Sequence, residues 1–334
     1  MGGVIQNIAA LESQVGTRPA AVNLKVIDHL DAQALKWVAV SPLAFAGFSD
    51  AERIDITIAG GDRGFATASS ANQLRLPRAL LDDPGHARAG CGVGLLFLIP
   101  GLGETLRVNG RVEAATDEDM LVTVHECYAH CAKALLRSQF WQAADTPSPG
   151  DAQEFLAAAR YMALATADTA LNTDVSPKGD PAGMLVRPCG GGIRYADRPG
   201  NRRTDSFRNI LARPSAAAVL VVPGCTRVAV LQGGVQIDAD PALRQSFAVQ
   251  DKAPKLVSTF MAPSLVLRES AALARARPWE AVSPPSDIDP AEIFAAHVKL
   301  NKARGLGAMI AKGMVSVPGL MRKGLEQDYK RNLY

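Results

Sequence analysis

The sequence has few of the features that mark secreted, membrane or nucleic-acid-binding proteins. It contains only five cysteines, an odd number, and no signal peptide is recognisable, so we expect a reducing cytoplasm. The longest apolar runs, VGLLFLIPG and SAAAVLVVPG, end in Pro-Gly and are too short to cross a bilayer, so no transmembrane segment is expected. A formal net charge of only +3 argues against a general nucleic-acid binder.

Catalytic signatures are equally scarce. Histidine occurs only five times, and the sequence has no G-x-S-x-G nucleophile elbow, no P-loop and no G-x-G-x-x-G after a strand. Paired carboxylates lie at expected helix starts and turns, where capping explains them. These absences argue against hydrolase, P-loop and Rossmann chemistry, and they leave the catalytic residues unknown.

Glycine, proline and apolar residues are abundant by contrast. The 334 residues include 29 Gly and 21 Pro, and 48% of them are hydrophobic. This composition predicts a sizeable core built from many short strands and turns rather than from long helices.

The chain contains an internal repeat. Three blocks recur in the same order in each half: a Gly-broken loop, two strands around a Pro-Gly turn, and a helix followed by Trp. We therefore predict a mainly β (α+β) chain with two tandem small β-barrels and flanking helices. The paired blocks are 55–64 with 174–183, 92–120 with 215–243, and 133–141 with 271–279. The expected divisions are an N-terminal arm at 1–24, copy 1 at 25–145, copy 2 at 151–285 and a basic helical tail at 290–334.

The tail carries eight Lys or Arg against three acids. Its first part has helical spacing after Asp289-Pro290, a cap-plus-proline signal. We expect a helix packed across the two barrels with a solvated basic face. Contact with an anionic surface or a partner is the alternative, but Gly and Pro interrupt the apolar face that it would need.

Two loops of copy 2 concentrate positive charge. SPKGDPAG (176–183) and RPGNRR (198–203) surround Lys and Arg with Gly and Pro, so backbone amides and guanidinium forks can approach an anion. One interpretation is a phosphate site. The other is that these Arg side chains pair with Asp197 and Asp205 on a surface turn.

Copy 1 has polar residues in two places. In GETLRVNGR (103–111), alternation puts Arg107, Asn109 and Arg111 on one face of a strand, which is typical either of a ligand-facing surface or of a solvent-facing edge. In HECYAHCAKALLRSQFW (125–141), a helix would place Lys133, Arg137 and Trp141 in line. The His and Cys residues there do not complete a zinc set, so no metal site is expected.

These blocks together resemble the pyridoxamine 5′-phosphate oxidase-like FMN-binding proteins. The resemblance lies in LATADTALNTDVSPKGDPAGMLVR, YADRPGNRRTDSFRNILARP, LLFLIPGLGETLRVNGR and HCAKALLRSQFW. It implies split β-barrels, with FMN in the groove between two barrels and contacted by residues from both. In related flavoproteins these motifs lie in one copy and two chains form a dimer, whereas here they are divided between the copies.

The resemblance implies the following cofactor-binding residues. From copy 2 they are Ser176, Lys178, Gly179, Arg198, Asn201, Arg202 and Arg203; from copy 1 they are Arg107, Asn109, Arg111, Lys133, Arg137, Ser138 and Trp141, beside His130 and Cys131 of the same motif. Arg202, Arg203 and Lys178 are expected at the phosphate, Lys133 and Arg137 at the pyrimidine side of the ring, and Trp141 against the ring.

Each copy lacks what the other keeps. Ala59 stands where copy 2 has Lys178, and Ala271 stands where copy 1 has Lys133. Ala229 and Leu231 are expected where copy 1 has Arg107 and Asn109. Because fusing two chains removes the need for two equivalent grooves, we predict an intrachain pseudo-dimer with one intact FMN site.

The function implied is that of an FMN-dependent oxidoreductase acting on an unidentified small molecule, with NADH or NADPH as a candidate electron donor. One alternative is a non-catalytic flavin, haem or other tetrapyrrole binder, with His130 or His125 as an iron ligand. Another is a reductase that uses the deazaflavin F420. The pseudo-dimer could be monomeric or could form a homodimer.

Overall fold

The computed structural model describes residues 3–144, 148–200, 203–280, 283–303, 306–316 and 319–334. The first unit is a seven-stranded antiparallel sheet in the order β2-β1-β5-β6-β7-β4-β3. Its strands are β1 (Leu43–Ser49), β2 (Ile54–Gly60), β3 (Thr67–Ser70), β4 (Gln73–Pro77), β5 (Gly92–Leu98), β6 (Thr105–Ala115) and β7 (Asp119–His130).

The second unit repeats this arrangement. Its antiparallel order is β10-β11-β14-β13-β12-β8-β9, which is the order of the first unit read from the other edge. The predicted repeat is therefore confirmed, and the fold is mainly β with flanking helices. The strands are β8 (Tyr161–Ala167), β9 (Thr173–Gly179), β10 (Val186–Cys189), β11 (Gly192–Ala196), β12 (Ser215–Val221), β13 (Arg227–Asp238) and β14 (Val257–Glu269).

Helices occupy matching places in the two units. One precedes the first strand of each sheet, and one follows the last strand. Asp151 caps its helix by accepting a hydrogen bond from the Glu154 amide at 2.9 Å, as the sequence predicts. The matching pairs are α2 (Ala32–Val40) with α4 (Ala152–Ala158), and α3 (Lys133–Ser138) with α7 (Ala271–Ala276). The second unit adds α5 (Asp205–Ala212) and α6 (Pro241–Ser246), and the first has two 3₁₀ turns, η2 (Arg78–Leu80) and η3 (Pro84–His86).

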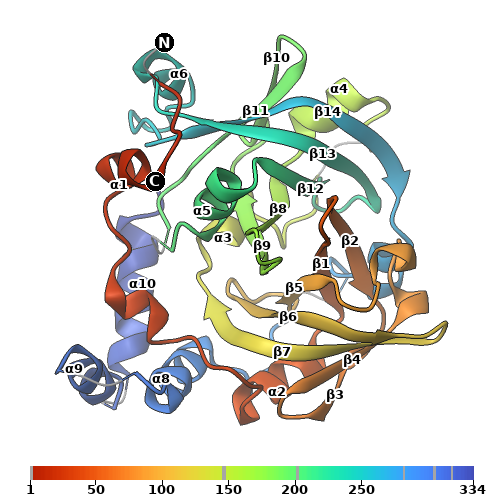
Figure 1. Ribbon diagram of the computed structural model, residues 1–334, viewed down its shortest axis with the longest axis vertical. Helices are drawn as coiled ribbons and strands as arrows, with labels where there is room; N and C mark the ends of the chain where they lie inside the picture. Colours follow the sequence, from red (N-terminus) through yellow and green to blue (C-terminus); the bar gives the residue numbers. More distant parts are fainter. Residues whose placement is uncertain (1–2, 145–147, 201–202, 281–282, 304–305, 317–318) are drawn as a thin grey trace.

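The two sheets face one another through a shared apolar core (Figure 1). Its central aromatic contacts join Tyr161 of the second unit to Phe45 and Phe140 of the first, with ring centroids 5.4 and 4.7 Å apart. Trp279 of the second unit lies 5.8 Å from Phe140. The sheets thus form the intrachain pair of split β-barrels that the sequence predicts.

Matched backbone contacts reproduce the symmetry of a dimer. Arg137 Nε donates to the carbonyl of Gly179 at 2.9 Å, and its counterpart Arg275 Nε donates to the carbonyl of Gly60 at 3.0 Å. A Cβ on Gly179 would lie 1.9 Å from a carbonyl oxygen of the opposite unit, and one on Gly60 would lie 2.4 Å from the matching carbonyl oxygen. Both positions therefore require glycine because the backbones approach so closely.

The two ends of the chain pack on opposite units. Leu11 and Val15 of α1 (Ile8–Val15) belong to the core of the second unit, and a short 3₁₀ turn, η1 (Ala20–Asn23), follows. In the tail, α8 (Pro290–Leu300) places Ile293 and Phe294 in the core of the first unit, and α9 (Leu306–Val315) and α10 (Leu320–Arg331) follow it. Within the described ranges, no helix combines the length and apolar character needed to cross a membrane.

We predict that Phe140→Ala lowers the free energy of unfolding by about 3–5 kcal/mol, because it opens a cavity in the core shared by both units. Urea denaturation should show one transition in the wild type, since neither unit has this core without the other. Leu136→Ala, one turn away on the exposed face of α3, is the matched control and should change stability by less than about 0.5 kcal/mol. Equal losses in the two variants, or two separate wild-type transitions, would contradict the shared-core interpretation.

Candidate functional site

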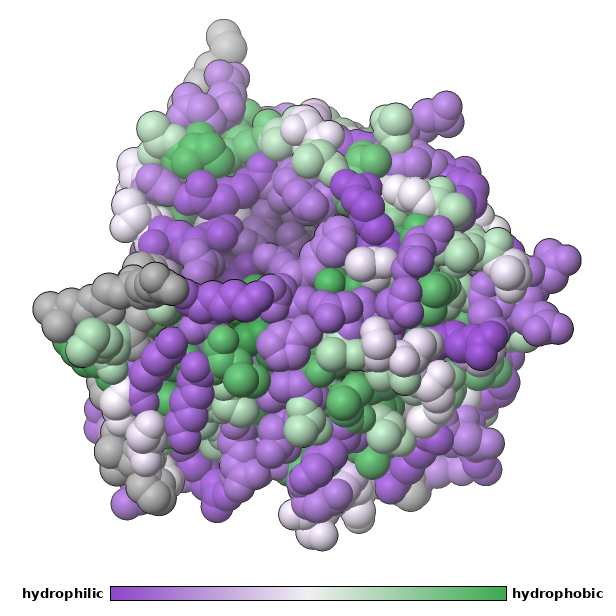
Figure 2. Space-filling model, turned by 60° about the horizontal axis from the view of Figure 1, so that its bottom comes forward, coloured by the Kyte–Doolittle hydropathy of each residue, from purple (hydrophilic) through white to green (hydrophobic). Residues whose placement is uncertain are grey.

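A cavity of about 570 Å³ lies between the two units, within the usual range for small-molecule sites. Its walls come from the start of β6, the end of β7 and the start of α3 in the first unit, and from β9, the loop after β11 and the start of α5 in the second. The 252–255 loop and the end of the C-terminal tail complete it. Figure 2 shows a hollow with mainly hydrophilic walls opening at the surface.

Most of the sequence-predicted site residues line this cavity. Both units contribute, as the resemblance implies, and the lining set is Arg107, His130, Cys131, Lys133, Arg137, Ser176, Lys178, Gly179, Arg198 and Arg203. Two predicted residues, Asn201 and Arg202, lie outside the described residues. The structure does not place the remaining four at the cavity wall: Asn109, Arg111, Ser138 and Trp141.

Those four side chains have structural partners instead. Asn109 donates to the Asp174 carboxylate at 2.8 Å, and Arg111 donates to the Ala170 carbonyl at 2.5 Å, so both join β6 to the second unit. Ser138 bonds within its own helix. Trp141 lies beyond the end of α3 and packs in the shared core, because residues up to 130 form β7 and the expected long helix is only six residues. The interpretation of residues 125–141 as one helix is therefore wrong.

Arg107 lines the cavity and is only 1% exposed. Its Nη1 donates to the Tyr128 hydroxyl at 2.6 Å and to Asp174 Oδ1 at 3.2 Å, and its Nη2 donates to Ser176 Oγ at 3.2 Å. Burial opposes its charge, but Tyr128, Asp174 and Asp205 outweigh it and raise the pKa of Arg107. The face of β6 that could have been a solvent-exposed edge is thus an inter-unit contact.

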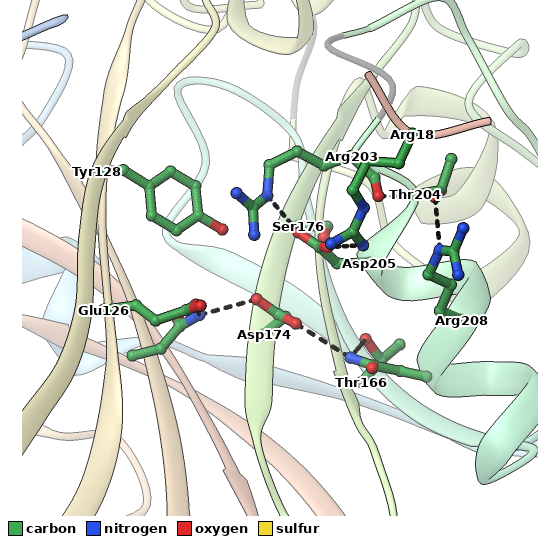
Figure 3. A network of polar contacts seen from close by, with 12 residues as sticks. Arg18, Glu126, Tyr128, Thr166, Asp174, Ser176, Arg203, Thr204, Asp205 and Arg208 are labelled. Atoms are coloured by element: carbon green, nitrogen blue, oxygen red, sulfur yellow. Dashed lines mark hydrogen bonds and ion pairs between the residues drawn. The ribbon is translucent and has the colours of Figure 1, made fainter. Parts of the chain in front are cut away.

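Asp174 is the carboxylate on which this contact converges. Asn209 of α5 donates to its second oxygen at 3.1 Å (Figure 3). Burial raises the pKa of Asp174 to about 6, and the Arg107 charge limits the rise. The carboxylate is therefore held by donors from both units.

Asp205, at the start of α5, holds a second group of arginines (Figure 3). Arg203 Nε donates to its Oδ2 at 2.6 Å, and Arg18 of the N-terminal arm also pairs with it. Burial opposes ionisation, but Arg203 and Arg107 outweigh it and lower the pKa of Asp205. The guanidinium carbon of Arg203 lies 4.4 Å from the Tyr128 ring centre, so this pair also spans the two units.

Lys178 and Arg198 line the cavity from the second unit. Lys178 Nζ lies 3.6 Å from Asp197 Oδ1, and burial lowers the pKa of this lysine. Arg198 Nε donates to Asp180 at 2.7 Å. Of the Arg-Asp pairs expected for a surface turn, the one with Asp205 forms, through Arg203, whereas Asp197 pairs with Lys178 and Arg198 pairs with Asp180. All three carboxylates line the cavity instead of a surface turn.

The cavity carries an excess of positive charge. Among the described residues, eight basic side chains line it against four acidic ones. Arg198 Nη2 is buried and has no hydrogen-bond partner in the described part of the chain. A cavity with surplus cations and an unpaired guanidinium nitrogen is suited to an anionic ligand. The basic residues are Arg107, Lys133, Arg137, Lys178, Arg198, Arg203, Lys252 and Lys255; the acidic residues are Asp180, Asp197, Asp205 and Asp328.

A comparison with known families finds a match to the second unit, which supplies the charged loops of the cavity. Residues 148–276 match the family model described as "Pyridoxamine 5'-phosphate oxidase". The matched segment comprises β8 to β14 and contains the charged loops of the second unit. No curated protein matches the sequence.

Several solved structures resemble part of the chain. HupZ from Group A Streptococcus is 15% identical with a TM-score of 0.30, over 37% of this chain and 98% of that chain. An F420 Reductase is 20% identical with a TM-score of 0.27, over 36% and 98%. General Stress Protein 26 from Bacillus anthracis str. Sterne is 14% identical with a TM-score of 0.27, over 34% and 88%. Scores this low do not extend the assignment beyond the family match.

The pseudo-symmetric groove, between β2 of the first unit and β13 of the second, lacks the central cation. The counterparts expected from the sequence, Ala229 and Leu231, are each wrong by one residue. A shift of one residue along a strand exchanges the side chains of its two faces, so neither of them takes the place of Arg107 or Asn109. Gln232 still donates to Asp55 at 3.0 Å, so a neutral amide remains where the guanidinium does not. The strand register pairs Val230 with the position of Arg107 and Gln232 with that of Asn109.

Two groups at or near the cavity have no clear sequence signal. The C-terminal residues Asp328, Asn332 and Tyr334 line it, although they are far away in sequence and belong to a tail whose composition is basic. Lys25 lies behind the wall, and its Nζ donates to the Ala129 carbonyl at 2.7 Å. A single lysine in an N-terminal segment gives no pattern from which burial could be predicted.

His130 lies at the cavity as a neutral imidazole. Burial, and after it the charges of Arg107 and Lys25, hold the pKa of His130 well below its usual value. Within the described residues, no group of three or more His, Cys, Asp or Glu side chains is arranged to hold a metal ion.

We predict that Lys25 makes stability increase with pH. Burial is the main cause that lowers its pKa to about 7, whereas an unfolded lysine titrates near its usual, much higher value. Above pH 7 the unfolded state therefore binds more protons, and the free energy of unfolding rises by up to about 1.4 kcal/mol per pH unit. Urea denaturation of wild type and Lys25→Met from pH 7.5 to 9.5 measures this: the variant should show a flatter dependence, and parallel curves would refute the assignment.

Proposed function

We propose that the protein binds FMN in the cavity between its two units and acts as an FMN-dependent oxidoreductase on a small molecule. The observation that carries this proposal is the composition of the cavity wall: basic side chains from both units converge on it, and Arg198 Nη2 has no partner in the described residues. The oxidase-family match of the second unit supports the same cofactor class.

The residues present fit a phosphorylated flavin. Lys133 and Arg137, which the resemblance assigns to the pyrimidine side of the ring, line the same cavity as Lys178 and Arg198, and all four provide the donors that a phosphate group requires. Arg107 and Ser176 are hydrogen-bonded to each other at the same cavity and would hold polar atoms of the ring. Bound flavin supplies hydride or electron transfer, so the protein needs no acid-base set of its own.

The chain's contribution is binding and electrostatics. Positive charge around the cavity favours anionic states of a bound group, and the shared core keeps both walls fixed relative to each other. The contacts of Arg107 with Tyr128, Asp174 and Asp205 raise its pKa, so its charge is permanent across the physiological pH range. Substrate and electron donor would enter from the open side of the same cavity.

A haem-binding function is the second candidate, and His130 favours it. A neutral imidazole at the cavity wall is the form that binds iron. The absorption spectrum of the purified protein separates the two, because flavin and haem bands are distinct. Binding of F420 in place of FMN would be detected by titrating each cofactor into the same protein.

We predict that Arg137→Ala weakens FMN binding about ten-fold or more, because a charge-assisted contact contributes about 1.5–3 kcal/mol. Arg275→Ala is a matched control, since it removes the same type of inter-unit hydrogen bond at a position outside this cavity. Dissociation constants from fluorescence quenching measure both. Equal affinities in the two variants would remove Arg137 from the site, and a protein that binds no FMN would refute the proposal.

A further inference from the structure

The last residues of the chain lie in the mouth of the cavity. Figure 1 shows α10 running along one side of the molecule towards the end of the chain near α1 and α5. Asp328 Oδ2 lies 2.8 Å from Lys133 Nζ, and the Leu333 carbonyl accepts from Arg137 Nη1 at 2.8 Å. The Tyr334 main-chain oxygen accepts from Lys252 Nζ at 3.0 Å.

The ring of Tyr334 adds a further contact to the same cations. Its centre lies 6.0 Å from the guanidinium carbon of Arg137 and 5.8 Å from that of Arg198. The segment thus presents a carboxylate, two carbonyl oxygens and an aromatic face to four basic side chains that line the cavity. These are the kinds of group that an anionic aromatic ligand would present.

The packing of α10 limits which part of the C-terminal tail can move. Met321 and Leu325 of α10 pack against the core of the first unit. The contacts from Asp328 onwards, by contrast, are mainly polar: the Tyr329 hydroxyl accepts from the Ala132 amide at 3.3 Å, and the Tyr334 main-chain oxygen reaches the second unit through Lys252. The first part of α10 is therefore anchored by apolar packing, whereas its last turn and the residues after it are held by polar contacts, of which those to Lys133, Arg137 and Lys252 could be replaced by another anion.

The central ion pair is suited to exchange. Burial opposes ionisation of Asp328, but hydrogen bonds from Lys133 and Asn332 outweigh it and lower the pKa of this carboxyl, so it is charged at neutral pH. The Asp328 side chain is 43% exposed, although that of its partner Lys133 is only 4% exposed. Because water reaches the pair from the carboxylate side, its stabilisation is small, and its loss changes a competing equilibrium about two- to five-fold.

We propose that residues 328–334 are an internal competitor: they occupy the anion-binding part of the cavity when it is empty and move aside when an anionic ligand binds. This inference rests on the proposed FMN site, of which it describes the regulation. The ligand would exchange with Asp328 at Lys133 and with the Tyr334 ring at Arg137 and Arg198, so the strength of the tail contacts sets the apparent affinity.

The first test compares FMN affinity in two variants. Asp328→Asn and Tyr334→Ala should each bind FMN about two- to five-fold more tightly than the wild type. Glu326→Gln is the matched control, because it removes the same charge from an exposed position of α10 outside the cavity and should change nothing. In a Lys133→Met background, Asp328→Asn should have no effect, since its partner is gone.

Three results of this comparison would count against the inference or the proposed function. Unchanged or weaker binding in Asp328→Asn and Tyr334→Ala would overturn the inference and make the tail a fixed part of the site. A tightening that Glu326→Gln reproduces would also overturn it, because general electrostatics would then explain the effect. FMN binding by none of the proteins would refute the proposed function and leave the competitor inference to a second experiment.

The second experiment uses inorganic pyrophosphate as the probe and needs no flavin. Hydrogen exchange at residues 328–334 of the wild type should become faster in saturating pyrophosphate, while exchange in β9 should not. Unchanged exchange at 328–334 would overturn the inference whether or not the protein binds FMN.

Discussion

The structure depends on the close approach of two glycine backbones to the opposite unit. Gly179 and Gly60 leave no room for a side chain, and each carbonyl accepts a hydrogen bond from an arginine of the facing helix. This pair of contacts sets the spacing of the sheets, and with it the aromatic packing around Tyr161 and the width of the cavity. A larger spacing would leave the cations of the two walls unable to act on one ligand.

On this symmetric frame the charges are arranged asymmetrically. One groove buries Arg107 against Asp174, whereas the other has Val230 and Gln232 at the corresponding strand positions. A buried charge is tolerated only where it is paired, so losing the guanidinium also removes the need for most of its partners. Fusion of two copies into one chain allows this, because each position can then change without changing its counterpart.

The sequence predicts the repeat, the mainly β fold and most of the basic residues described at the cavity wall, because strand periodicity and loop chemistry are local signals. Four expected ligands, Asn109, Arg111, Ser138 and Trp141, lie elsewhere for reasons that are not local. The helix expected to include Trp141 ends at Ser138, and the β6 side chains meet the other unit. The placement of Asp328 and Tyr334 at the cavity depends on tertiary packing of the tail, for which composition gives no signal.

The packing of the chain ends also bears on how the protein is made. Leu11 and Val15 belong to the core of the unit that is synthesised last. During translation, α1 therefore leaves the ribosome long before its binding surface exists, with the whole first unit in between. Contacts this distant in sequence form slowly, and the exposed apolar face of α1 in the meantime is a point at which chaperones or aggregation would act.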